Sequence, residues 1–334
     1  MFHQTPIKTG AVLIVLAGLG VYTLAGGYFA RELVIEAAVL AMLAVSLDVL
    51  AGYGGMISLC HGAVLGLGAY AYAAATVKLG APPVLAVAAA MAIPALFGAG
   101  IGAVASRTRG IFFIMATLAF GQMVYVLVFD ARILGGDDGL SGVPRLDLSA
   151  LGIDLQSSTA FAFLALACLG LTYAAAARLL TSGFGRTLCG IRENEDRMRA
   201  LGVTVWKFKA GAFAFSGLLA GLAGALSAQH TMFVSPELMS WMVSGEALVM
   251  VILGGLGTLA GPVVGAVSLV LLKHLISGLT NYWHMIIGAI LILAVAVGGR
   301  GLYGGLEALI EPRLPRRAKA GRAAPDLARA PADA

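Results

Sequence analysis

Residues 11–30 read AVLIVLAGLGVYTLAGGYFA and contain no charged side chain over twenty positions. About 20 apolar residues in an α-helix span the hydrocarbon core of a bilayer. The rest of the 334-residue chain has the same character, since 60% of its residues are hydrophobic, only 12% are charged and 45 are glycine. A soluble domain has about 25% charged residues, and small residues let membrane helices pack closely. We therefore expect an all-α integral membrane protein.

Nine further apolar stretches follow the first along the chain, and Gly-rich breaks interrupt them at residues 54–55 and 254–257. We expect about ten transmembrane segments in one polytopic membrane domain, residues 1–299, with short, tilted or re-entrant segments at the Gly breaks. Residues 300–334 are rich in Arg, Pro and Ala and are expected to be a basic, disordered tail. The segments are 11–30, 33–50, 57–77, 84–106, 110–129, 155–177, 210–228, 238–253, 258–276 and 282–299.

The basic residues orient these segments in the membrane. If the charged stretch at 185–203 lies in the cytoplasm and the segments alternate, 17 of the 22 Lys and Arg fall inside. Because Lys and Arg collect in cytoplasmic loops, this arrangement is favoured, with both termini inside. The first segment also has features of a signal peptide, because Lys8 precedes it. Its length exceeds that of a typical signal core, so we expect a retained helix.

Several motifs that suggest chemistry do not fit this setting. Residues 255–260 match GxGxxA but lack the strand and acidic partner of a dinucleotide site, and the chain has no P-loop motif for ATP. Ser58 and His61 lie three residues apart, so they could share a helix face and suggest an intramembrane hydrolase. A hydrogen bond across a helix interface or an aqueous path is the preferred interpretation. Three scattered cysteines predict neither disulfide framework nor zinc site. We expect no catalytic residue and no metal.

Acidic residues within apolar segments are costly in lipid and face a bundle interior, water or a membrane boundary. Glu36, Asp48 and Glu246 are of this kind. They leave open an ion-coupled secondary transporter, although water-facing or hydrogen-bonded positions also explain them. The sequences at the two Gly breaks, 54–59 and 254–259, are alike and indicate either close packing or a transport path. The residues that we predict to line a path are Ser58, His61, Gln122, Glu246, Gly254, Gly255 and Gly257.

One charged stretch, GRTLCGIRENEDRMRALGV at 185–203, interrupts the apolar sequence. A helix over 186–201 would place Leu188, Ile191, Met198 and Leu201 on one face and would end at Gly202. The opposite face carries both signs of charge. A helix that lies on a membrane surface has a mostly basic polar face, whereas mixed charge suits a specific protein interface. A solvated loop remains the alternative.

This stretch resembles the cytoplasmic coupling loop of ABC-importer permeases for branched-chain amino acids, the LivM-like family. Similar motifs occur in order at Ser58–Tyr70, 117–121, 136–144, 220–226, 234–236 and 254–262. Cys60 and Asp138 depart from the family pattern, in which Gly and Asn are usual. The resemblance implies a coupling loop at 181–209 that contacts the ATPase through Gly185, Arg186, Ile191, Arg192, Glu193, Asn194, Glu195, Ala200, Leu201 and Gly202.

The resemblance also implies a function and its partners. The chain would be a permease subunit in the bacterial inner membrane that translocates branched-chain amino acids or related small solutes. It would pair with a second related permease, two cytosolic ABC ATPases and an extracytoplasmic binding protein, and it would interact with lipid but not nucleic acid. ATP and Mg²⁺ would bind the ATPases, so this chain would hold no cofactor and would not be an enzyme. The alternatives are an ion-coupled secondary transporter and a non-transporting membrane scaffold.

Overall fold

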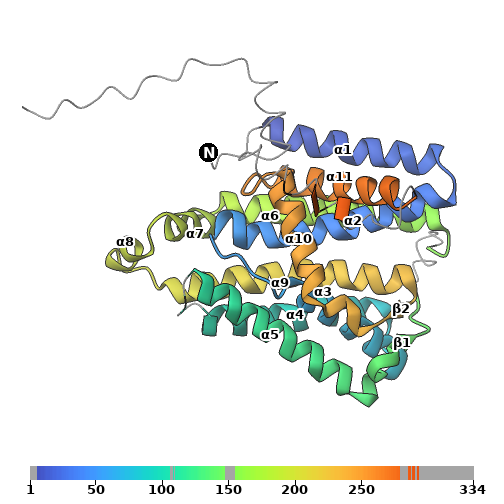
Figure 1. Ribbon diagram of the computed structural model, residues 1–334, viewed down its shortest axis with the longest axis horizontal. Helices are drawn as coiled ribbons and strands as arrows, with labels where there is room; N and C mark the ends of the chain where they lie inside the picture. Colours follow the sequence, from blue (N-terminus) through green and yellow to red (C-terminus); the bar gives the residue numbers. More distant parts are fainter. Residues whose placement is uncertain are drawn as a thin grey trace, which may run out of the picture.

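The computed structural model describes residues 6–105, 108, 110–146 and 155–278, and five residues between 285 and 292, with side chains from residue 10 onwards. Long helices packed side by side form most of this part of the chain (Figure 1). The helices are α1 (Pro6–Ala25), α2 (Tyr28–Asp48), α3 (His61–Ala73), α4 (Pro83–Ala105), α5 (Ile111–Asp130), α6 (Ser158–Thr181), α7 (Gly183–Glu193), α8 (Glu195–Ala200), α9 (Val205–Thr231), α10 (Trp241–Gly254) and α11 (Ala260–Ser277).

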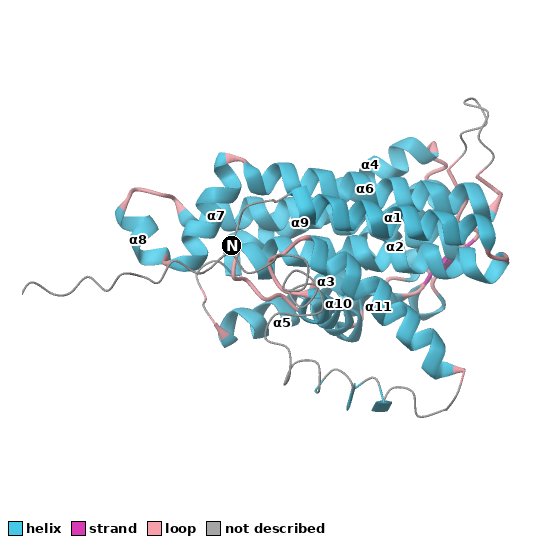
Figure 2. Cartoon of the chain, turned by 90° about the horizontal axis from the view of Figure 1, so that it is seen from above, coloured by secondary structure: helices cyan, strands magenta, loops and turns pink. Residues whose placement is uncertain are grey.

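Short elements mark the two ends of the bundle. α7 and α8 project from one end, and two antiparallel strands lie at the other, with Leu140 of β1 (Leu140–Ser141) opposite Val234 of β2 (Phe233–Val234) (Figures 1 and 2). π-helical turns extend α2 and α3, and 3-10 turns lie near the strands. These turns are Val49–Tyr53, Ala74–Lys78, Arg132–Leu134, Gly136–Asp138 and Pro236–Met239.

Six described helices are long and apolar enough to cross a membrane, namely α2 with its π-helical turn, α4, α5, α6, α9 and α11. α10 and the apolar part of α1 are shorter, and α3 has only 13 residues. The all-α membrane class is therefore confirmed. Each of the first nine predicted segments coincides with a helix, whereas the segment 282–299 lies mostly outside the described residues, as does the tail. The number of ten spans stays a prediction.

One predicted boundary is wrong. The first two segments were expected to meet after residue 30, but α1 ends at Ala25 and α2 begins at Tyr28. Gly26 and Gly27 form the turn, and a side chain at Gly26 would collide with Ala30. The hydropathy of residues 11–30 does not reveal this turn. Two glycines can interrupt a helix, but they do not lower the apolar character of the sequence.

The axis of the bundle is α2. The apolar window of this helix is 89% buried, against 28% for α4 and α5. α6, α9, α10 and α11 pack around it, and its last residues reach the α7–α8 end (Figure 1). A helix that is buried on every side cannot be recognised from an amphipathic pattern, and α2 indeed carries apolar residues all round apart from Glu32, Glu36, Asp48 and a few others.

Glycines bring α9 into close contact with α4. Gly98 and Gly102 of α4 face the backbone of α9 at Phe213 and Ala210, and Gly217 of α9 faces Pro94. Both pairs of glycines on these helices, 98 with 102 and 217 with 221, have the small-xxx-small spacing that lets membrane helices approach. Pro94 contributes further, because it lacks an N–H and so leaves the carbonyl of Ala90 without its helical donor. Gly221 lies against that carbonyl.

We predict that Gly98→Ala lowers the stability of the folded protein by about 1–3 kcal/mol, since overpacking has that cost. The new Cβ would stand 2.5 Å from the carbonyl oxygen of Phe213. Thermal unfolding in detergent measures the effect as a lower Tm. Gly100→Ala is the matched control, because nothing lies within 4 Å of its Cβ position on the same helix. Equal Tm values for the two variants would contradict this account of the interface.

Candidate functional site at the α7–α8 end of the bundle

The charged stretch forms two helices instead of the single predicted one. α7 ends at Glu193, and Asn194 adopts an extended conformation with φ −159° and ψ 100° before α8 begins. The Asn194 side-chain oxygen accepts a hydrogen bond from the backbone N–H of Arg197 at 2.8 Å. This is an N-cap, which Asn favours because it satisfies a free helix N–H. The predicted end at Gly202 is confirmed by its positive φ of 84°.

The break changes which apolar residues are buried. Leu188 and Ile191 of α7 pack into the bundle, and Met198 of α8 is half-buried against Gly190. Leu201 was expected on the same face, but it is 72% exposed. The prediction was wrong there because it assumed one continuous helix, whereas the turn at Asn194 redirects α8.

Arg192 of α7 is exposed, but its guanidinium group reaches the bundle. Its Nη1 donates a hydrogen bond to the backbone carbonyl of Gly52, in the π-helical turn after α2. Its side chain also covers Gly55, where an added Cβ would stand 2.9 Å from Arg192 Cγ and where φ is +68°. Only glycine adopts that conformation without strain. Arg192 therefore joins α7 to the first Gly break.

Glu195 also binds within the protein. Its carboxylate pairs with Lys209 of α9 at 3.0 Å and with Arg199, four residues along α8, at 2.6 Å. The Lys209 and Glu195 side chains are only 7% and 13% exposed. Partly buried ion pairs are screened less by salt than surface pairs, so this pair fixes α8 to the start of α9.

The remaining charged side chains of this stretch point outward. Two large apolar side chains share this outer surface, Leu201 at 72% and Trp206 at 52% exposure. Gly185, by contrast, is buried against Leu180. The exposed outer face, as we call this set, consists of Arg186, Glu193, Asp196, Arg197, Ala200, Leu201 and Trp206. It combines two large apolar side chains with charges of both signs.

The two Gly breaks touch each other, and Asp48 joins them. The Asp48 carboxylate accepts hydrogen bonds from the backbone N–H groups of Gly257 at 2.7 Å and Leu259 at 3.1 Å. Gly52 packs directly on Gly257, where a Cβ would stand 2.6 Å from the Gly257 nitrogen. We call residues 48–56 and 254–261, together with Arg192, the inner junction. It brings together segments that are about two hundred positions apart in the chain.

The sequence indicated part of this site. It singled out Arg192 and both Gly breaks, including Gly254, Gly255 and Gly257, but did not predict that they meet. Asp48 was noted only as an acid in an apolar segment. Its role as a backbone cap had one visible signal, a carboxylate less than two turns before a Gly break. That signal gives no partner, because Gly257 and Leu259 come from the other end of the chain.

Ser58 and His61 are fully buried beside the junction. Ser58 Oγ lies 3.1 Å from Cys60 Sγ, and His61 Nε2 lies 2.9 Å from Ser216 Oγ. Ser216 donates its hydroxyl proton to the carbonyl of Ser46 at 2.7 Å, so its oxygen accepts from His61. Ser58 and His61 thus bind different partners, and these contacts form no nucleophile–base pair of the hydrolase kind.

The other predicted path residues lie on different helices. Gln122 is half-buried on α5, next to Gly121, which packs on Cys60. Glu246 is on α10, away from the inner junction, 3.5 Å from Lys273 Nζ. The structure therefore places Ser58 and His61 near each other, Gln122 beside a glycine that packs on Cys60, and Glu246 in another region. Their role in a path stays a prediction.

The remaining groups with reactive chemistry are possible metal ligands and the thiol of Cys189. Within the described residues, no group of three His, Cys, Asp or Glu side chains is placed to hold a metal ion. Cys189 on α7 is half-buried, and burial raises the pKa of its thiol above the usual value, with smaller opposing and reinforcing contributions from Arg192 and Glu193. A raised pKa keeps the thiol neutral, and a neutral thiol is a poor nucleophile.

Comparison with known proteins places this geometry in context. The family model described as "Branched-chain amino acid transport system / permease component" matches residues 29–295. The high-affinity branched-chain amino acid transport system permease protein LivM of Escherichia coli K12 is 30% identical over 285 residues, which cover 78% of this chain and 67% of LivM.

Two sugar permeases of the same organism are also similar. The ribose import permease protein RbsC is 28% identical over 242 residues, covering 67% of this chain and 71% of RbsC. The xylose transport system permease protein XylH is 30% identical over 126 residues, covering 34% of this chain and 31% of XylH. No solved structure matches the chain.

We predict that Asp48→Asn loosens the second Gly break. Asparagine offers one acceptor oxygen in place of two and turns an NH₂ group toward a backbone N–H, and a lost hydrogen bond to a charged group costs about 1.5–3 kcal/mol. Hydrogen exchange in a peptide covering 255–260 should therefore become about 10–100-fold faster. Asp130→Asn, at the exposed end of α5, is the control. Unchanged exchange at 255–260 would show that Asp48 does not hold the break.

Proposed function

The chain belongs to the family of permease components of branched-chain amino acid ABC transport systems, and we propose that it is a translocating subunit of an ATP-driven importer. In this proposal it pairs with a second related permease in a bacterial inner membrane. Two cytosolic ABC ATPases dock at the α7–α8 end, and an extracytoplasmic binding protein delivers the solute at the opposite end. ATP and Mg²⁺ bind the ATPases, so this chain carries no catalytic residue.

The division of the α7–α8 residues into inward and outward sets carries this proposal. The exposed outer face offers apolar side chains surrounded by mixed charges, and such surfaces suit specific protein contacts. Glu195 is partly buried and Arg192 is exposed, but both bind the bundle, Arg192 at Gly52 and Glu195 at Lys209. The absence of a P-loop motif from the sequence agrees with a motor on a separate chain.

The inward contacts supply a route by which ATPase movement reaches the membrane helices. A displacement of α8 acts on α9 through the Glu195–Lys209 pair, and a displacement of α7 acts on the end of α2 through the Arg192–Gly52 hydrogen bond. The hydrogen bonds of Asp48 transmit this movement to the segment between α10 and α11. Rigid helices that move about such contacts give two discrete arrangements, here outward-open and inward-open, and ATP binding shifts the population between them.

The charge distribution supports the proposed orientation. The α7–α8 end carries the basic stretch and is assigned to the cytoplasm, in line with the positive-inside rule. The opposite end includes the loop with Asp130, Asp137 and Asp138. The termini are assigned to the cytoplasm on the same basis. The solute is a branched-chain amino acid or a related small molecule, with sugars as the alternative that RbsC and XylH suggest.

An ion-coupled secondary transporter and a membrane scaffold without transport are the competing functions. A secondary transporter would work without an ATPase and would respond to the dissipation of ion gradients. A scaffold would bind the ATPase but pass no solute. Uptake into proteoliposomes, measured with and without ATP and the partner proteins, separates the three functions.

We predict that two variants separate docking from coupling. Leu201→Asp places a charge in the exposed outer face and should weaken ATPase co-purification by about tenfold or more, because an apolar anchor at an interface contributes over 1 kcal/mol. Arg192→Ala should leave co-purification intact but lower solute uptake per ATP hydrolysed, because it cuts the contact with Gly52. Co-purification and reconstituted uptake measure the two effects.

Arg178→Ala, at the exposed end of α6, is the control for the loss of a cytoplasmic arginine. It should retain both docking and coupling. If Arg192→Ala transported as the wild type does, the inner junction would have no part in coupling. If Leu201→Asp kept its ATPase, the exposed outer face would not be the docking surface.

A photo-crosslink identifies the partner directly. We predict that a photoreactive amino acid at Asp196, which is exposed, traps an ABC ATPase in irradiated cells, as mass spectrometry of the adduct would reveal. The same probe at Glu195 should trap far less, since that side chain is 13% exposed and faces Lys209. Adducts with lipid alone at Asp196 would indicate a surface helix and would count against an ATPase partner.

A further inference from the structure

Three charged residues meet within three apolar helices, far from the inner junction. Lys273 Nζ on α11 lies 3.5 Å from Glu246 Oε1 on α10 and 4.0 Å from Glu36 Oε1 on α2. We call these residues the ion triad. At the end of the bundle opposite α7 and α8, α2 begins at Tyr28, α10 begins at Trp241 and α11 ends at Ser277. At about 1.5 Å per helical residue, each residue of the triad lies about 6–12 Å along its helix from that end.

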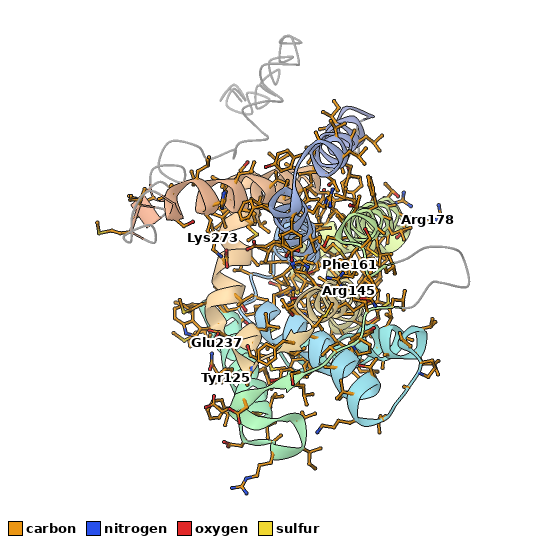
Figure 3. The ribbon with its side chains drawn as sticks, turned by 90° about the vertical axis from the view of Figure 1, so that its right-hand side faces the viewer. Tyr125, Arg145, Phe161, Arg178, Glu237 and Lys273 are labelled. Atoms are coloured by element: carbon orange, nitrogen blue, oxygen red, sulfur yellow. The ribbon has the colours of Figure 1, made fainter. Side chains whose placement is uncertain are left out.

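The ion triad is open on one side. Its side chains are 49% exposed at Glu36, 34% at Lys273 and 31% at Glu246. Viewed from the end opposite α7 and α8, Lys273 lies on the same side of the bundle as Glu237 and Tyr125, whereas Arg145 and Phe161 lie deeper between helices (Figure 3). The three helices thus present charge on a common face.

Lipid tails are an unsuitable neighbour for this face. Ionisable residues within membrane segments face protein or water, pair with one another and mark substrate pathways. As ionised groups, the two carboxylates and one ammonium sum to a formal charge of −1. Covering this surplus charge with an apolar protein surface would incur a desolvation penalty. Water together with a mobile cationic group balances the negative charge with a smaller desolvation penalty.

We propose that the ion triad recognises the ammonium group of the transported solute, on the route from the binding protein toward the inner junction. This inference rests on the proposed importer function and names the chemistry of its solute. The ammonium fits the pair of glutamates, and Lys273 accommodates a carboxylate, so the site suits a zwitterion. A neutral sugar offers neither charge, and the triad therefore favours amino acids over the sugars carried by RbsC and XylH.

Uptake of leucine by the complete complex tests the proposal. The double variant Glu36→Gln and Glu246→Gln keeps side-chain size but leaves Lys273 to repel the ammonium. We expect about tenfold slower ATP-driven uptake, with the ATPase still bound, because the ammonium loses its hydrogen bonds to charged groups. Glu237→Gln, an exposed glutamate on the same face, is the matched control and should transport normally.

The lipid composition separates the two sources of an ammonium group. The vesicles contain phosphatidylcholine and phosphatidylglycerol, so that no lipid headgroup carries a primary ammonium. If the triad holds an aminophospholipid instead of the solute, the double variant will transport as the wild type does, and this result overturns the proposal. A wild-type complex without ATP-driven uptake would instead overturn the importer function.

A labelling experiment tests the site without transport. Met242→Cys lies one turn before Glu246 on α10 and keeps all three charges. A cationic methanethiosulfonate should modify it about tenfold faster than an anionic one of similar size, since a charged path concentrates counter-ions. The ratio should fall toward one when Glu36→Gln and Glu246→Gln are added. Leu96→Cys, 74% exposed on α4, is the lipid-facing control. An unreactive Met242→Cys, or a ratio near one in the presence of the triad, overturns the site.

Discussion

A break in a helix within a membrane frees backbone N–H and C=O groups that lipid cannot satisfy, and this constraint organises the structure. The chain breaks twice inside the bundle, after α2 and after α10. At the second break, the Asp48 carboxylate accepts hydrogen bonds from two of the freed N–H groups. The Thr258 hydroxyl donates to the carbonyl of Gly255 and accepts from the N–H of Gly261. Arg192 supplies a donor to the carbonyl of Gly52 at the first.

Side chains from other helices complete the first break. Thr117 of α5 accepts a hydrogen bond from the N–H of Leu59, and Ser244 of α10 accepts one from Gly62, at the start of α3. Each small hydroxyl therefore fixes the position of a helix relative to a loop. Such fixed contacts couple the bundle mechanically, because an irregular backbone that depends on neighbouring helices moves with them.

Close packing and charge placement have separate roles in the same bundle. Glycines hold α4 and α9 together as one unit, and the Glu195–Lys209 pair connects that unit to α8. The inner junction connects α7, the helix before α8, to α2, α10 and α11. The ion triad joins these last three helices at the opposite end. α2, α10 and α11 thus carry polar contacts at both ends, one set facing the proposed motor and the other the proposed entrance.

The sequence by itself determined the membrane class, the positions of nine helices and the family, because hydropathy and ordered motifs are local properties of the chain. It also marked Arg192, the Gly breaks and Glu246 as candidate residues. The turn at Asn194, the exposure of Leu201 and the pairing of Glu195 with Lys209 required the structure, since a helical pattern does not show where a cap redirects the chain. Only the tertiary structure decided that Asp48 meets Gly257 and that Lys273 meets Glu36. Hydrogen bonds and ion pairs depend on distances of a few ångströms, and helix packing brings together residues that lie more than two hundred positions apart.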